Sequence, residues 1–334
     1  MSDYKNISLE KGMYKIGGKS FTQVLSELDP DENYIDTPLE GLDAFQRQLK
    51  RYDIKVSGKG ADKIEKFFQT SQSSALFPEY ICRAVKSGME FDNVLPKICS
   101  TTTVIDGMDY RSIASTPTDD EKALADVAEG AVIPETVIHT QENLVKLKKR
   151  GRMLVSSYEA LKFQSLDVFT VALKQIGSYI SRMLLNDAVD VLINGDGNNN
   201  AADIINETNL FSYNDLVAMW TSFAPYKLDT IIAPTALVNT MLGLTEMKDS
   251  VAGLNFHATG ELITPLGAQL IHVPGMASNK LIGLDSRYAL EMVQAGDIVT
   301  EYDKLIDRQL ERASISCIAG FAKIFRDASK TLSY

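Results

Sequence analysis

Apolar residues recur every three or four positions between Ser165 and Gly197, which is the period of one face of an α-helix. Ser165 is a suitable N-cap, and Asp167 favours the positive N-terminal end of a helix. Gly195 and Gly197 tolerate the backbone of a C-terminal cap, so we expect the helix to end there. Such a helix would be about 40 Å long, and one face should pack on a sheet. The apolar stripe consists of Leu166, Phe169, Leu173, Ile176, Ile180, Leu184, Val191 and Leu192.

The first 70 residues contain short amphipathic helices with recognisable start signals. Ser20 followed by Gln23 is a capping box that predicts a helix to about Leu28. Thr37-Pro38-Leu39-Glu40 predicts a second helix with proline at its first position, and residues 62–65 predict a third. Helices this short are unstable alone, so their apolar sides need a partner surface. The stripe of the second helix, here named the N-terminal clamp, is Leu39, Leu42, Phe45 and Leu49.

The next segment changes from helical to extended patterns. Residues 71–100 predict an extended arm that ends in a short helix. Thr101–Ile105 and Tyr110–Ile113 are rich in residues that favour strands. They flank Asp106-Gly107, a turn signal that predicts a β-hairpin.

A long polar loop is expected over residues 114–140, and ordered loops of this length usually serve a function. Residues 143–155 predict a strand, and Ser156 to Glu159 would cap a short helix before the long one. The last forty residues predict an antiparallel sheet that pairs with the 143–155 strand. Between these parts we expect strands at Leu228–Ile232, Ala268–Val273, Leu281–Leu284 and Ala289–Val293, and a helix at Pro234–Leu242.

Two oppositely charged segments are candidates for contacts between subunits. Residues 119–135 hold six acids and one lysine, a net charge of −5, whereas residues 142–152 hold five bases and one acid, a net charge of +4. Metal binding by the acidic loop and phosphate binding by the basic strand are the alternatives. The residues concerned are Asp119, Asp120, Glu121 and Glu129 in the loop, and Lys146, Lys148, Lys149, Arg150 and Arg152 in the strand.

Composition narrows the function classes. The 334 residues are 45% hydrophobic and 23% charged, as in ordinary globular proteins. No apolar run approaches the roughly 20 residues of a membrane-spanning helix. The formal net charge of −10 argues against a tight, sequence-independent nucleic-acid binder. The cysteines are too far apart for zinc spacing and fit a reducing compartment; they are Cys82, Cys99 and Cys317.

No motif predicts catalysis, a cofactor or a metal. The chain lacks GxSxG, P-loop and GxGxxG patterns, and its three histidines do not have metal-ligand spacing. Four residues match positions of a calcium-binding EF-hand loop, but Ala201 stands where the sharp turn requires glycine. A polar turn after the long helix is the simpler interpretation. The four residues are Asp196, Asn198, Asn200 and Glu207.

The order of these segments resembles the major capsid proteins of tailed phages, whose α+β fold is shared with encapsulins. Each motif alone is weak, and their order and spacing carry the resemblance over about residues 70–334. The segments are LFPEYICRAV (76–85), STTTVIDGMDYRSI (100–113), AEGAVIPET (128–136), VKLKKRGRMLVSSYEAL (145–161), MLLNDAVDVLINGDG (183–197), DTIIAPTAL (229–237) and ERASISCIAGFAKIFRDAS (311–329).

The resemblance implies the domain organisation of a capsid subunit with a long spine helix. It assigns residues 71–100 to the N-terminal arm and residues 101–145 to a projecting hairpin, the E-loop. The peripheral (P) domain would be residues 146–205 and 296–334, and the axial (A) domain residues 206–295. Residues 1–70 would be an N-terminal helical extension, which we expect to stay attached; some members of the family instead lose such a segment on maturation.

The resemblance also implies a function without catalysis or cofactors. The chain would form homo-pentamers and homo-hexamers of an icosahedral shell, assembled in the host cytoplasm and found in the virion. Its partners would be the portal, other head proteins and double-stranded DNA, which is contacted weakly and without sequence specificity; no membrane is involved. The alternative is an encapsulin-like compartment around a cargo enzyme. Some members cross-link through an E-loop lysine, but Lys122 has no identified partner, so this chemistry is not assigned.

Overall fold

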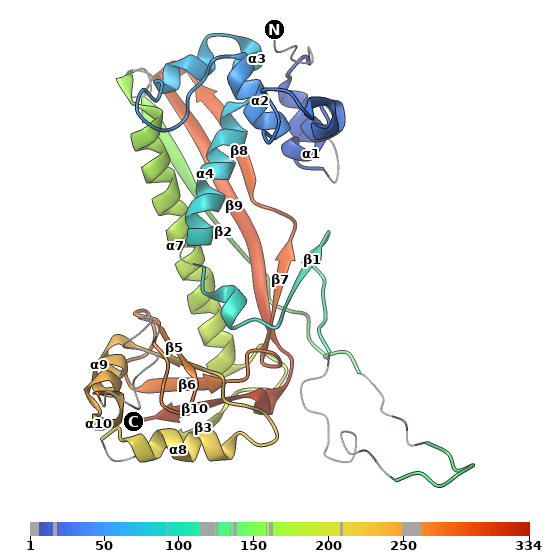
Figure 1. Ribbon diagram of the computed structural model, residues 1–334, viewed down its shortest axis with the longest axis vertical. Coiled ribbons are helices and arrows are strands. Elements are labelled where there is room, and N and C mark those ends of the chain that lie inside the picture. Colours follow the sequence, from blue (N-terminus) through green and yellow to red (C-terminus); the bar gives the residue numbers. More distant parts are fainter. Residues whose placement is uncertain are drawn as a thin grey trace. The chain divides into compact units, whose positions relative to one another are not determined.

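A computed structural model of the chain describes residues 7–15, 19–91, 93–113, 124, 126–133, 135, 139–157, 159, 163–207, 210–248 and 262–334. The chain divides into two compact units, each built from three separate segments. The first unit comprises Met1–Asn93, Lys149–Ser181 and Asp297–Cys317. The second comprises Val94–Lys148, Arg182–Gly296 and Ile318–Tyr334. The described helices and the two mixed sheets make this an α+β protein, and Figure 1 shows these elements.

The first unit begins with short helices and contains part of the longest helix. Strand β8 runs antiparallel to the first half of β9, and β2 is the other neighbour of β9. The elements are η1 (Lys11–Lys15), α1 (Phe21–Leu28), η2 (Asp31–Tyr34), α2 (Ala44–Arg51), η3 (Ile64–Phe68), α3 (Ser71–Ser74), α4 (Phe77–Phe91), β2 (Lys148–Ser157), α7 (Leu166–Asn194), β8 (Val299–Leu305), η5 (Ile306–Arg308) and β9 (Leu310–Lys323).

The second unit contains a five-stranded sheet in the order β3-β10-β6-β4-β5. In the other sheet, β1 pairs in parallel with β7, and β7 pairs antiparallel with the end of β9. The elements are η4 (Leu95–Lys97), β1 (Thr101–Ile105), β3 (Asp203–Asn206), α8 (Tyr213–Ser222), β4 (Thr230–Ala233), α9 (Thr235–Gly243), α10 (Thr245–Lys248), β5 (Gln269–His272), β6 (Lys280–Leu284), β7 (Leu290–Ala295), η6 (Arg326–Ala328) and β10 (Ser329–Ser333).

The strongest patterns in the sequence are confirmed. Helix α7 has 29 residues, and every residue of its predicted stripe is buried or half-buried. The capping box at Ser20 forms as predicted, with the Gln23 N–H donating to the serine hydroxyl. Strands β4 to β7 and helix α9 lie within two residues of the predicted segments, and β9 pairs with β2. Strand β2 itself begins five residues later than predicted and extends to Ser157, where a helix start had been expected.

The prediction that α2 starts at Thr37 is wrong. Gly41 has a φ angle of 78°, so a helix that starts after Thr37 cannot continue through this position. Helix α2 begins six residues later, where Asp43 and Gln46 form the capping box.

Two further expectations for residues 71–113 are also wrong. The arm is largely helical. Pro78 does not interrupt it, because this residue lies in the first turn of α4, where a missing N–H is tolerated. No hairpin joins Thr101–Ile105 to Tyr110–Ile113. Strand β1 instead runs parallel to β7, and residues 109–112 are not in a strand.

Helices α4 and α7 touch through their backbones in the first unit, where Figure 1 shows them together. A Cβ added at Gly88 of α4 would lie 2.1 Å from the carbonyl oxygen of Lys174 in α7. A Cβ at Gly177 of α7 would lie 2.1 Å from the carbonyl oxygen of Val85. Only glycine therefore fits at the two contact points.

An aromatic cluster completes the packing of the first unit. The Phe77 ring lies 5.4 Å from that of Phe67 and 6.1 Å from that of Phe169. The Tyr80 hydroxyl donates to the Leu166 carbonyl at 3.0 Å. Segment 64–80 is thereby attached to α7. In the second unit, α8 and α9 cover the five-stranded sheet with a core that includes Leu216, Met219, Phe223, Leu237, Met241 and Leu281.

We expect Gly88→Ala to destabilise the subunit by about 1–3 kcal/mol, the usual cost of overpacking a core, because neither backbone can move aside freely. Urea unfolding of the unassembled subunit measures this change. Gly243→Ala is the matched control, since an added Cβ at Gly243 in α9 meets nothing within 4 Å. Equal stability of the two variants would contradict the backbone contact.

Candidate assembly surfaces

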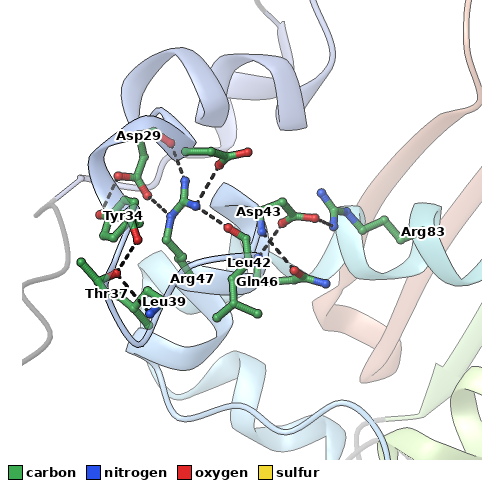
Figure 2. Close-up of polar contacts among 10 residues, drawn as sticks. Asp29, Tyr34, Thr37, Leu39, Leu42, Asp43, Gln46, Arg47 and Arg83 are labelled. Atoms are coloured by element: carbon green, nitrogen blue, oxygen red, sulfur yellow. Dashed lines mark hydrogen bonds and ion pairs between the residues drawn. The ribbon is translucent and has the colours of Figure 1, made fainter.

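A buried ion pair organises the N-terminal segment (Figure 2). The guanidinium of Arg47 and the carboxylate of Asp29 are both 1% exposed, with Nε donating to Oδ2 at 2.9 Å. Arg47 also donates to Asp31 at 2.8 Å and to the Leu42 carbonyl, and its guanidinium lies 4.3 Å from the Tyr34 ring centre. Burial lowers the pKa of Arg47, but its hydrogen bonds to Asp29 and Asp31 outweigh this and raise the pKa above its ordinary value. The arginine therefore stays charged and paired.

A second cation joins this segment to α4. Arg83 donates to Asp43, the N-cap of α2, at 2.6 Å and to Glu79 at 2.9 Å. It also donates to Thr22 of α1 at 3.2 Å. Its guanidinium lies 4.4 Å from the ring centre of Phe45. Helices α1 and α2 are thus held against α4 of the same chain.

The structure places the N-terminal clamp inside its own unit. Leu39, Phe45 and Leu49 are 2%, 3% and 6% exposed, and Leu42 is half-buried. The sequence pattern did not reveal the role of Arg47, which lies beside these apolar positions and looks like an ordinary surface base. Its importance depends on Asp29, 18 residues away.

Only part of the acidic loop is described. Asp119, Asp120 and Glu121, together with Lys122, lie outside the described residues. Glu129 is exposed. The structure adds a feature that the charge pattern did not indicate, namely several exposed apolar side chains in the described part of the loop. These are Leu124 (101% exposed), Val127 (41%), Val132 (91%) and Ile133 (72%).

Two bases of the basic strand make contacts or are half-buried within their own subunit. Lys148 donates to Asp187 of α7 at 2.7 Å, and Arg150 is half-buried. Lys146, Lys149 and Arg152 are exposed. Strand β2 lies at an edge of its sheet and also exposes Met153 and Val155, each 54% accessible. An edge strand with exposed cations and apolar side chains is suited to contact another chain.

Buried polar contacts in the second unit hold the chain where it enters and where it leaves the acidic loop; these two places are here called the roots of the loop. Glu291 of β7 is 6% exposed and accepts hydrogen bonds from the hydroxyls of Thr103, Tyr110 and Ser112. Burial, together with the hydrogen bond to Glu291, raises the pKa of Tyr110. These four residues anchor the chain that enters the loop.

Lys323 and Gln141 anchor the chain that leaves the loop. Gln141 donates to the Lys323 carbonyl at 3.1 Å, and the Lys323 N–H donates to Asp196 at 2.9 Å. The fully buried ammonium of Lys323 donates to the Leu192 carbonyl at 3.4 Å, in the last turn of α7. Burial lowers the pKa of Lys323 to about 8, and nearby Arg326 adds to this effect.

Three of the EF-hand-like residues, Asp196, Asn198 and Asn200, form hydrogen bonds where the chain leaves the loop. Asp196 accepts hydrogen bonds from Lys323 and from Asn198, and Asn200 accepts one from the Asp196 N–H. Among the residues that the structure describes, no group of three or more His, Cys, Asp or Glu side chains is placed to hold a metal ion. Within the same residues, no helix is both long enough and apolar enough to cross a membrane.

Comparisons with known proteins agree with this arrangement. Residues 140–304, just under half of the chain, match the family model of the phage capsid protein. The virus-like particle from Pyrococcus furiosus has a TM-score of 0.53 and 13% identity over 76% of this chain and 98% of that chain. The capsid of the native GTA particle has a TM-score of 0.53 and 13% identity over 72% of this chain and 89% of that chain.

The capsid of the empty GTA particle is similar to the same extent, with a TM-score of 0.52 and 14% identity over 72% of this chain and 89% of that chain. A comparison with curated proteins gave no match. At these identities the structural likeness shows the fold. The chain has the capsid fold of tailed phages, as its segment order predicted.

We expect Arg47→Met to lower the stability of the unassembled subunit by about 3–5 kcal/mol, because Asp29 would remain buried without its partner. Urea unfolding monitored by circular dichroism measures the loss. Arg308→Met is the control, since Arg308 and Asp307 form an exposed pair that should contribute at most about 1 kcal/mol. A small loss at Arg47 would show that the pair does not organise the segment.

Lys323 predicts a pH dependence of stability. Its pKa falls from 10.5 to about 8 on folding, so between these values the unfolded chain binds more protons and stability rises with pH. From about pH 7 to about pH 9.5, this group should add about 2 kcal/mol to the free energy of unfolding. Lys323→Met removes the titrating group, so the free-energy difference between wild type and variant should change by that amount. A difference that does not vary with pH would contradict the assignment.

Proposed function

We propose that the chain is a phage capsid protein, the major subunit of an icosahedral shell assembled as pentamers and hexamers around double-stranded DNA. The observation that carries this proposal is the capsid fold, joined to the family match over residues 140–304. The role is structural and not catalytic. Assembly occurs in the host cytoplasm, and the mature location is the virion, where the portal and other head proteins are further partners.

The domains follow the capsid plan. Residues 206–295 form the axial domain, and residues 146–205 with 296–334 form the peripheral domain. Residues 71–100 are the arm, which is helical here, and residues 101–145 carry the E-loop. The encapsulin-like alternative is not favoured, because the family model that matches is that of phage capsid proteins.

Residues 1–70 remain attached in the mature subunit. The contacts of Arg83 support this, because its guanidinium in α4 pairs with Asp43 and donates to Thr22 of the segment, while the buried pair of Arg47 with Asp29 holds the segment itself together. Removing the segment would leave Glu79, which is 8% exposed, without its Thr22 partner. Intact-mass spectrometry of DNA-filled particles tests this point, and a dominant species that begins between residues 55 and 75 would contradict it.

The acidic loop of one subunit docks on the basic strand β2 of a neighbour. Both surfaces combine charge with exposed apolar side chains, and the charges are opposite: −5 over residues 119–135 and +4 over residues 142–152. Single exposed ion pairs contribute at most about 1 kcal/mol, so the apolar residues supply the burial while the charges set the register. Val132 and Ile133 of the loop, with Met153 and Val155 of the strand, are the apolar contacts.

Electron microscopy of the purified full-length protein tests the function. Closed shells or capsomers are expected, and particles isolated from infected cells should contain DNA and a portal at one vertex. A stable monomer at high concentration under several salt conditions would contradict the proposal. Shells filled with a single bound enzyme and no DNA would favour the encapsulin-like alternative.

We expect the triple variant Lys146→Glu, Lys149→Glu, Arg152→Glu to assemble poorly while its circular dichroism stays unchanged. These three bases are exposed. By contrast, Lys148 donates to Asp187 and Arg150 is half-buried in the same subunit. The yield of sedimenting shells is the measurement. The control changes three other exposed bases to glutamate: Lys50, Lys97 and Lys248.

Charge restoration separates docking from general repulsion. Reversing Asp119, Asp120 and Glu121 to lysine in the same chain should recover assembly of the strand variant. Normal assembly of the strand variant alone, or equal losses in the strand variant and its control, would contradict the electrostatic part of the docking.

A further inference from the structure

We propose that the exposed face of α7 in the first unit is a two-fold contact with α7 of a second copy of the chain. The inference rests on the proposed function, because a shell of pentamers and hexamers also needs contacts that join neighbouring capsomers. It goes further by assigning such a contact to one helix face. Docking of the E-loop on β2 joins two different surfaces, whereas a two-fold axis requires one surface that is complementary to itself.

Helix α7 is apolar on two opposite sides, and its own chain covers only one of them. The predicted stripe is buried or half-buried. The opposite side of the same turns exposes Val168 (59%), Val171 (67%) and Tyr179 (51%). The other exposed positions on this side are Ala172 and Gln175, so no charge interrupts the face. A helix that is apolar all round is normally buried all round, which indicates that another chain covers the second side.

The charges beside this face favour a second copy as the partner. Asp167 and Lys174 are both exposed and lie about two turns apart on the same side of the helix. When two such helices pack antiparallel about a point near Val171, Asp167 of each copy lies near Lys174 of the other. The same arrangement places Val171 beside Val171, and Val168 beside Ala172. Opposite charges and apolar side chains therefore match in one register.

The segment next to the start of α7 carries no net charge that would repel a second copy. Residues 53–66 hold four lysines and three acids. Asp167 is the fourth acid, and it accepts a hydrogen bond from the Gly58 N–H at 3.2 Å. Phe163, which precedes α7, is 68% exposed, and Tyr179 is at the other end of the face. An antiparallel pair therefore has an aromatic side chain at each end, as is common in contacts between proteins.

Cysteine cross-linking tests the contact in assembled particles of the full-length chain. Val171→Cys places a thiol on each side of the two-fold axis, and facing residues of packed helices can approach within the roughly 7 Å between Cα atoms that a disulfide allows. Mild oxidation should convert most chains to dimers on a non-reducing gel. Val299→Cys is the matched control and should stay monomeric, because Val299 of β8 is 54% exposed in the same unit but lies outside the face.

The native thiols should contribute little to this cross-linking. Burial raises the pKa of Cys82, Cys99 and Cys317, so few of these thiols are in the reactive thiolate form near neutral pH. Oxidised wild-type particles measure the remaining background.

A charge change tests the register. Lys174→Glu in the Val171→Cys chain should lower the dimer yield several-fold, because the new carboxylate would face Asp167 of the second copy. Lys174→Arg keeps the charge and should keep the yield. An unchanged yield in the Lys174→Glu chain would overturn the paired register.

The outcomes separate this contact from the proposed function. Shells that form normally but give no dimer of the Val171→Cys chain would overturn the α7 contact and leave the proposed function intact. Cross-links from position 171 to a native cysteine, identified by mass spectrometry, would also overturn it, because a different surface would then lie on α7. If the protein forms no shells, the proposed function fails, and the dimer yield of concentrated unassembled chains still decides the contact.

Discussion

Direct contact between the backbones of α4 and α7 constrains the whole first unit. No side chain separates the helices at Gly88 and Gly177, so any larger residue there would drive them apart. The hydrogen bonds of Tyr80 to Leu166 and Thr170, at 3.0 and 2.6 Å, need the same close spacing. The other contacts of α4 depend on this position, because Arg83 and Glu79 of α4 hold α1 and α2. The attachment of the N-terminal segment therefore depends on how α4 packs against α7.

Burying an unpaired charge destabilises the folded state, and three buried groups of this chain are stabilised by different kinds of partner. Arg47 is paired with Asp29 inside the N-terminal segment. Glu291 is surrounded by three donating hydroxyls instead of a cation. Lys323 has a helix-terminal carbonyl as the acceptor of its ammonium group, which leaves its pKa lowered to about 8. The last two lie where the chain enters and leaves the acidic loop, so both ends of the loop are fixed by buried polar contacts.

Contacts within the chain decide which bases of β2 are available to another subunit. Lys148 is paired with Asp187 of α7. Lys149 and Arg152 are exposed and stand at a sheet edge beside exposed Met153 and Val155, a setting that suits a neighbouring subunit.

Local periodicity alone determined the long helix, strands β4 to β7 and the capping box at Ser20, because each depends on residues a few positions apart. The order of these segments also predicted the capsid fold. Tertiary structure decided the rest. Thr37 carries a capping signal, but the left-handed backbone at Gly41 prevents a helix from continuing there. Strand β1 pairs with β7, 190 residues along the chain, instead of with its predicted hairpin partner.

The roles of buried polar residues also required the tertiary structure. Arg47, Glu291 and Lys323 read as ordinary surface residues in the sequence, because nothing near them marks the groups they meet. Their partners lie far along the chain: Asp29 is 18 residues from Arg47, and Leu192 is 131 residues from Lys323. Periodicity reports which face of an element is apolar. It does not report which distant segment covers that face, and that pairing creates the buried charges and the exposed assembly surfaces.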